Sequence, residues 1–221
     1  MIFDTERNAF ESEKERNLYT KFFAGYFLNE MIIGYRDRVD SLSLLITERL
    51  QSHQIISSSD KIILDEPHVS FDNYAYLLLN TPDNRGEFAD VLIHDPKTGV
   101  MIALEVKFLT NFDTDKDCES NLKRINDIMK ENESLKLFFL LLIPREKWDT
   151  AEVMINHLGS NATRYKEVYK NKVGLLFWDE LIDLCSEEKV KSFMLKRLNL
   201  VNKPKSDRKW SISVNPIAAD S

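Results

Sequence analysis

Asp90, Glu105 and Lys107 are the residues whose types and spacing could do chemistry. Glu105 and Lys107 stand at the end of an otherwise apolar run that begins at Val100, with Val106 between them. Burying opposite charges in such a run costs several kcal/mol unless partners compensate them. Two carboxylates beside a lysine would suit metal-dependent phosphodiester hydrolysis. In that chemistry the carboxylates bind Mg²⁺, the metal polarises the phosphate and its water, and the lysine orients or activates the nucleophile.

A β-hairpin is predicted to bring these residues together. Because side chains alternate faces along a strand, the acid and the lysine of the triplet point the same way. Two apolar runs, 88–94 and 100–106, flank a turn that contains both Pro and Gly. Folding about the centre of this turn places Asp90 opposite Leu104 or Glu105. In such a register the two carboxylates lie within about 5–8 Å of each other.

At these positions the sequence resembles the PD-(D/E)XK nuclease superfamily, which has the restriction-endonuclease-like fold. The match consists of Asp90 and, fifteen residues later, the Glu105-x-Lys107 triplet, whereas Ala89 replaces the proline of the signature. The resemblance implies that Asp90 and Glu105 bind Mg²⁺, with Mn²⁺ as a substitute, and that Lys107 assists the attacking water. It also implies hydrolysis of DNA phosphodiester bonds in restriction, repair or recombination. The alternative is an ordinary strand pair with a buried ion network.

Four further residues are candidates for the same site. The first helix of the superfamily often supplies another acid, for which Glu15 is preferred over Glu30, and Glu87 precedes Asp90 closely enough to approach a metal. Asn121 and Arg124 are spaced to share one helix face and could contact a phosphate or the nucleic acid. For each of the four candidates, a solvated surface position remains the alternative.

The predicted elements define the fold class. Helices and strands are expected, in chain order, as follows: helices 11–33 and 41–52, strands 62–71 (interrupted at Pro67), 74–79, 88–94 and 100–107, helix 117–132, strand 135–143, helix 148–158, strand 173–178 and helices within 180–200. This order matches the αβββαβ core of the superfamily. We therefore expect an α/β protein whose mixed central sheet is flanked by helices, with additional C-terminal helices. Residues 1–201 would form one domain and residues 202–221 a tail.

Two local features complete the expected scaffold. An aromatic stripe on the first helix is predicted to be core rather than a platform for nucleic-acid bases, and it comprises Leu18, Tyr19, Phe22, Phe23, Tyr26 and Phe27. Asp179, directly after the strand 173–178, is predicted to cap the helix that follows.

Composition limits the classes of protein to consider. The chain has 221 residues, of which 43% are hydrophobic, so it is long enough for one well-buried domain. Its net charge of −6 argues against nonspecific nucleic-acid binding over the whole surface, although a local basic groove is compatible with it. The two cysteines have no metal-binding spacing, and no signal-peptide core or membrane-length apolar run is visible. We expect a cytoplasmic protein that acts on DNA and has no membrane partner. The sequence leaves open whether it forms a homodimer.

A second class of function fits the same fold. A catalytically silent restriction-endonuclease-like module could bind nucleic acid or a protein partner. Such a module would tend to lose one of the three charges, whereas Asp90, Glu105 and Lys107 are all present. The sequence therefore favours the enzyme.

Overall fold

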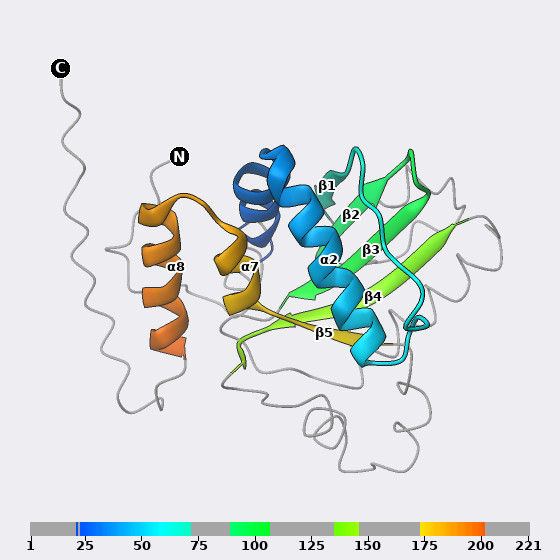
Figure 1. The fold of residues 1–221 in the computed structure, drawn as a ribbon. Coiled ribbons are helices and arrows are strands. Elements are labelled where there is room, and N and C mark those ends of the chain that lie inside the picture. Colours follow the sequence, from blue (N-terminus) through cyan, green and yellow to red (C-terminus); the bar gives the residue numbers. More distant parts are fainter. Residues whose placement is uncertain (1–20, 22, 72–88, 107–134, 146–172, 202–221) are drawn as a thin grey trace, which may run out of the picture.

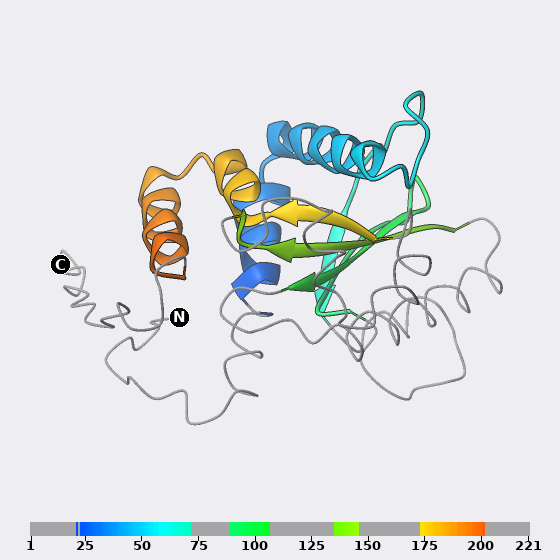
Figure 2. The same ribbon diagram turned by 90° about the horizontal axis from the view of Figure 1, so that it is seen from below.

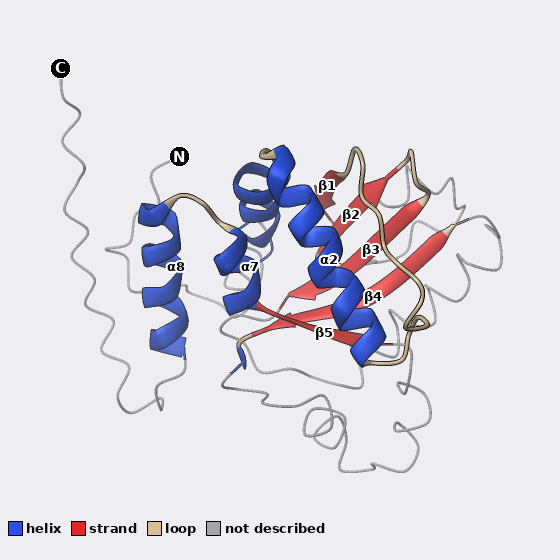
Figure 3. Cartoon of the chain, viewed as in Figure 1, coloured by secondary structure: helices blue, strands red, loops and turns tan. Residues whose placement is uncertain are grey.

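A five-stranded mixed sheet forms the centre of the molecule (Figures 1 and 3). This computed structural model describes residues 21, 23–71, 89–106, 135–145 and 173–201. The strands lie side by side in chain order: β1 (His68–Phe71), β2 (Val91–Asp95), β3 (Val100–Val106), β4 (Lys136–Ile143) and β5 (Val173–Phe177). The pairs β1–β2 and β2–β3 are antiparallel, and the pairs β3–β4 and β4–β5 are parallel. The predicted α/β class with a mixed sheet is confirmed.

Helices accompany the sheet at both ends of the chain. They are the π-helix η1 (Phe27–Ile33), α2 (Arg36–Ser52), α7 (Trp178–Leu184) and α8 (Glu188–Val201). Figure 2 shows α2 lying across one face of the sheet, with α7 and α8 towards one end. Within the described ranges, no helix has the length and apolar character needed to cross a membrane.

The segment before β1 departs from the predicted strand. Only His68–Phe71 pairs as a strand, whereas residues 62–67 are irregular. The backbone N–H of Ile62 donates to Thr47 Oγ1 at 2.9 Å, and that of Leu64 donates to Ser43 Oγ at 3.1 Å. These N–H groups are satisfied by side chains of α2, so the segment follows the helix instead of joining the sheet. The predicted strand 74–79 and the helices 117–132 and 148–158 lie outside the described residues.

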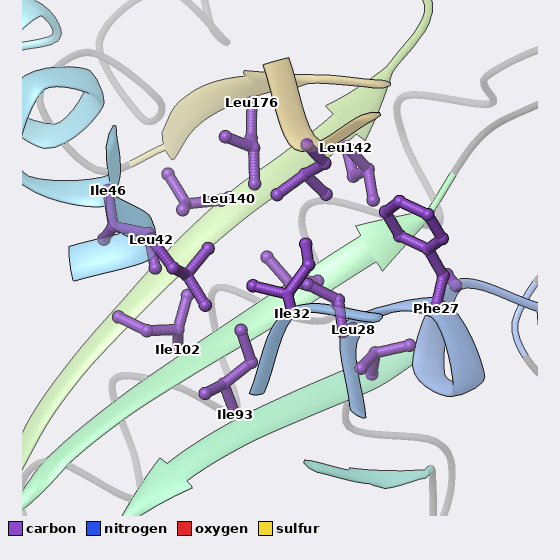
Figure 4. Packing of buried hydrophobic residues seen from close by; sticks show 14 of the residues in the cluster. Phe27, Leu28, Ile32, Leu42, Ile46, Ile93, Ile102, Leu140, Leu142 and Leu176 are labelled. Carbon is purple, nitrogen blue, oxygen red and sulfur yellow. The ribbon is translucent and has the colours of Figure 1, made fainter. Parts of the chain in front are cut away.

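The hydrophobic core lies between α2, η1 and one face of the sheet (Figure 4). Buried side chains of alternate strand positions line this face, among them Ile93, Ile102, Leu104, Leu140 and Leu142. Helix residues pack onto them, including Leu28, Ile32, Leu42 and Ile46. Each such buried aliphatic side chain contributes about 1.5–3 kcal/mol to folding. This packing fixes which strand residues point away from α2.

The predicted aromatic stripe of the first helix is wrong at one described position. Phe27 is core with 1% of its surface exposed, but Tyr26 is 55% exposed. The buried positions of this segment are instead Ala24, Phe27, Leu28 and Ile32. These positions follow the ordinary spacing of three and four residues, and Tyr26 stands two residues after Ala24, which places it on the opposite, solvent-facing side of the helix. Glu30, which the stripe would have buried, is exposed.

The turn between β2 and β3 is held by a buried carboxylate. Asp95, with no exposed surface, accepts backbone N–H groups of residues 97–98 on Oδ1 at 2.9 and 3.1 Å. Its Oδ2 accepts the backbone N–H groups of residues 65–66. Gly99 has a φ of 68°, the positive value predicted for this turn. The hairpin register is therefore fixed from the turn, at the far end from Asp90.

Candidate metal centre

The hairpin brings Asp90 opposite Glu105. Val91 pairs with Leu104 in the β2–β3 ladder, and continuing this register by one residue places the two acids across from each other. This is the second of the two registers predicted from the turn, and it is confirmed. Val91 and Leu104 both belong to the core beneath α2, so by alternation Asp90 and Glu105 share the opposite face of the sheet.

Both carboxylates are buried. Asp90 is 5% exposed and Glu105 is 7% exposed. Glu105 is the penultimate residue of β3 and is in register with Leu141 of the parallel neighbour β4. The pair therefore lies at the edge formed by the carboxyl ends of β3 and β4. Ligands in open α/β sheets commonly bind at this edge.

Asp90 has a defined partner on each carboxylate oxygen. Lys21 Nζ lies 2.9 Å from Oδ1. The backbone N–H of Val106 donates to Oδ2 at 2.7 Å. The hydrogen bond to Val106 ties the start of β2 to the end of β3, and the ion pair ties the first helical segment to the sheet.

Lys21 is the site residue that sequence reasoning missed. It is helical and 9% exposed, and its ammonium comes from a segment that precedes Asp90 by 69 residues. The predicted aromatic stripe leaves position 21 outside the buried face, so the sequence pattern did not indicate this residue. In the structure Lys21 stands three residues before Ala24 and seven before Leu28, both fully buried. A lysine at that spacing belongs to the buried face of the helix. Its four-carbon stem can lie against apolar neighbours while its ammonium reaches a polar group.

The other predicted site residues lie outside the described residues. They are Lys107, Glu15, Glu87, Asn121 and Arg124. Their assignments stay predictions, because the structure describes neither their positions nor their contacts. Of the residues predicted for the site, the structure describes only the two proposed metal ligands, Asp90 and Glu105.

The donor set of Asp90 and Glu105 fits a hard divalent cation. Among the described residues, no group of three or more His, Cys, Asp or Glu side chains is placed to hold a metal. Mg²⁺ does not require such a group, since it is usually bound through one or two carboxylates together with water and substrate phosphates. A carboxylate offers about four lone-pair positions. The contacts of Asp90 to Lys21 and Val106 use one on each oxygen, so acceptor capacity remains.

A second charged cluster lies at the ends of β4 and β5. Arg145 donates to Asp179 Oδ2 and to Glu180 Oε1, both at 2.7 Å, and Arg49 of α2 also pairs with Glu180. Both guanidinium groups also lie against the Phe177 ring, with their carbons 4.2 Å (Arg145) and 5.3 Å (Arg49) from its centre. Burial, followed by the neighbouring charge of Arg145, lowers the pKa of Arg49. The charges of the two cations and two anions balance in this cluster. We therefore interpret it as a structural clamp between α2, β4 and α7.

This clamp also corrects the predicted cap of α7. The residue at the helix cap is Phe177, and Asp179 lies inside α7. The side chain of Glu180 reaches back, and its Oε2 accepts the backbone N–H of Phe177 at 3.2 Å. Since Glu180 satisfies this donor, the helix begins one residue before Asp179, whose carboxylate pairs with Arg145.

Comparisons with protein-family models, with curated proteins and with solved structures give no match for this chain. The resemblance to the PD-(D/E)XK superfamily consequently rests on Asp90, Glu105 and Lys107 and on the order of the elements. What it implies beyond an α/β protein with a mixed sheet is a proposal.

Proposed function

We propose that the chain is a Mg²⁺-dependent nuclease with a restriction-endonuclease-like core, and that it hydrolyses phosphodiester bonds in DNA. The observation that carries the proposal is the pairing of Asp90 with Glu105. Two carboxylates on one buried face of a hairpin are an expensive arrangement, because desolvated like charges repel. Such an arrangement is typical of sites that bind a cation.

The sheet topology supports the same proposal. Helical residues precede three antiparallel strands, and a fourth strand is added parallel to the third. Parallel neighbours need a crossover connection, and the sequence predicts a helix within the connecting residues 107–135. The resulting αβββαβ order is that of the superfamily. Fold alone does not specify a reaction, so the proposed activity depends on the site residues.

Each site residue has a distinct role in the proposed reaction. Asp90 and Glu105 would hold the Mg²⁺ ion, which polarises a phosphate and lowers the pKa of bound water when it is present. Lys107 would orient the attacking water or accept its proton. The backbone N–H of Val106 fixes one oxygen of Asp90 and so orients that carboxylate. The choice of DNA over RNA follows from the resemblance to the superfamily.

One observation favours a second candidate, a silent module of the same fold that binds nucleic acid or a protein partner. Lys21 compensates the charge of Asp90 without any metal, as a purely structural ion pair would. The complete Asp90, Glu105 and Lys107 set argues against this candidate, because a silent copy has no need for all three charges.

Incubation of the purified chain with linear, circular and branched DNA tests the proposal. Reactions would contain Mg²⁺, Mn²⁺ or EDTA, and the variants Asp90→Asn and Glu105→Gln would be run beside the wild type. We expect metal-dependent cleavage that both variants lose, with circular DNA reporting endonuclease activity. Binding of DNA without cleavage under all metal conditions would support the silent module instead.

A further inference from the structure

The ion pair between Lys21 and Asp90 involves the same carboxylate that would bind the proposed metal. Its two side chains are 11% and 6% exposed, and Nζ lies 2.9 Å from Oδ1. At this depth little water screens the ammonium, so a second cation brought to the same carboxylate would be repelled. The metal and Lys21 therefore compete for Asp90.

Of the two partners of Asp90, Lys21 is the one that can move. The N–H of Val106 belongs to the backbone of β3, which is paired with β4 at this position, Val106 opposite Leu142. Lys21 instead reaches Asp90 through a flexible stem with rotatable bonds. A cation that binds Asp90 would leave the hydrogen bond to Val106 in place and force the ammonium to withdraw.

We propose that Lys21 is a built-in counter-cation of the metal centre: it neutralises Asp90 in the metal-free protein, and a divalent metal must displace it in order to bind. This inference rests on the proposed function, because it takes Asp90 as a metal ligand. It assigns Lys21 as a positioning residue that sets metal affinity. It also couples metal binding to the first helical segment, because that segment carries Lys21 and leads directly into η1.

The variant Lys21→Met tests this role, since methionine keeps an unbranched apolar side chain and removes the charge. Titration calorimetry with Mg²⁺ alone measures the dissociation constant, and the shift of the melting temperature with Mg²⁺ gives a second readout that needs no DNA. We expect binding at least about tenfold tighter than in the wild type, or about 1.4 kcal/mol. The melting temperature should also rise more with Mg²⁺ than in the wild type.

Lys97→Met is the matched control. Lys97 also pairs with acids, Asp65 and Glu66, but it lies at the turn end of the hairpin. The substitution Lys97→Met removes the same charge from the chain, and it should leave the Mg²⁺ dissociation constant within about twofold of the wild-type value. If Lys21→Met does not fold without metal, Lys21→Gln replaces it, because a neutral amide can still hydrogen-bond to Asp90.

The outcomes separate this inference from the proposed function. If the wild type binds Mg²⁺ through Asp90 and the Lys21 variants bind equally or more weakly, the metal site stands and the counter-cation role is overturned. If neither wild type nor Lys21 variants bind Mg²⁺, the proposed metal site fails, and the counter-cation role fails with it. Binding that becomes detectable only in the Lys21 variants, and is lost again when Asp90→Asn is added, supports the inference most directly.

Discussion

Replacement of Asp90 by asparagine should destabilise the metal-free protein. The change removes the negative partner of Lys21, and both side chains are nearly buried, at 11% and 6% exposure. Removing one member of a buried ion pair costs about 3–5 kcal/mol, because the remaining charge is left uncompensated. The amide oxygen of asparagine can still accept the N–H of Val106, so we expect a loss at the lower end, about 3 kcal/mol. For a chain of this size that loss lowers the melting temperature by about 6–12 °C.

Denaturant unfolding in EDTA measures this loss, with the fully buried Trp178 contributing to the fluorescence signal. Asp183→Asn is the control, since Asp183 pairs with Lys191 at the same 2.9 Å but is 70% exposed. The identical substitution there should hardly change the free energy of unfolding, because exposed ion pairs contribute little. An Asp90→Asn variant as stable as the wild type, or more stable, would refute the argument. It would mean that repulsion from Glu105 outweighs the attraction of Lys21.

Three other substitutions give distinct outcomes. Lys107→Ala should leave the circular dichroism spectrum and Mg²⁺ binding nearly unchanged and slow DNA cleavage by at least about 100-fold; retention of most activity would exclude a catalytic role for this lysine. Asp95→Asn should lose about 2–3 kcal/mol at pH 7, since an amide oxygen cannot accept all four N–H groups that the carboxylate accepts. Burial raises the pKa of Asp95, but the four backbone N–H groups together outweigh it and hold the pKa below its usual 3.8. The stabilisation by the Asp95 carboxylate is therefore present above the usual pKa of the group and is lost as the pH falls through its lower folded-state pKa. The difference in free energy of unfolding between wild type and Asp95→Asn, measured in urea, should shrink in acid. A difference that stays constant with pH would contradict the ionised carboxylate as the source of the stabilisation. Glu180→Gln should lose about 2 kcal/mol in thermal or urea unfolding, because it leaves Arg49 and Arg145 with one carboxylate between them; an unchanged stability would show that the clamp contributes nothing.

Local sequence patterns were sufficient for the strands that carry the site. An apolar run that contains Glu105 near its end predicted a strand from Val100, where β3 begins, and the turn signal at residues 95–99 narrowed the register of Asp90 to two choices. Strand alternation then placed Glu105 on the face away from Leu104. Each of these inferences depends on residues that are close in the sequence and joined by one short turn. Local sequence patterns are therefore enough to predict them.

Other features depended on contacts between distant segments. The first helix was predicted with its buried face misplaced, because the aromatic residues did not mark the face that packs on the sheet: Ala24, Leu28 and Ile32 are buried, whereas Tyr26 is exposed. Residues 62–64 have the composition of a strand, yet they run along α2, whose Thr47 and Ser43 accept the N–H groups of Ile62 and Leu64.

The sequence by itself determined an α/β chain, most of its described strands and a hairpin with two possible registers, one of which opposes the two acids. Only the tertiary structure decided what compensates those acids. Lys21 reaches Asp90 from a helical segment 69 residues away, and its approach depends on how that helix packs against the sheet. Here the periodicity did not place Lys21 on the buried face, and no periodicity can identify the carboxylate that a lysine meets. That choice is made by the packing of the core, which sets the relative positions of elements that the chain separates widely.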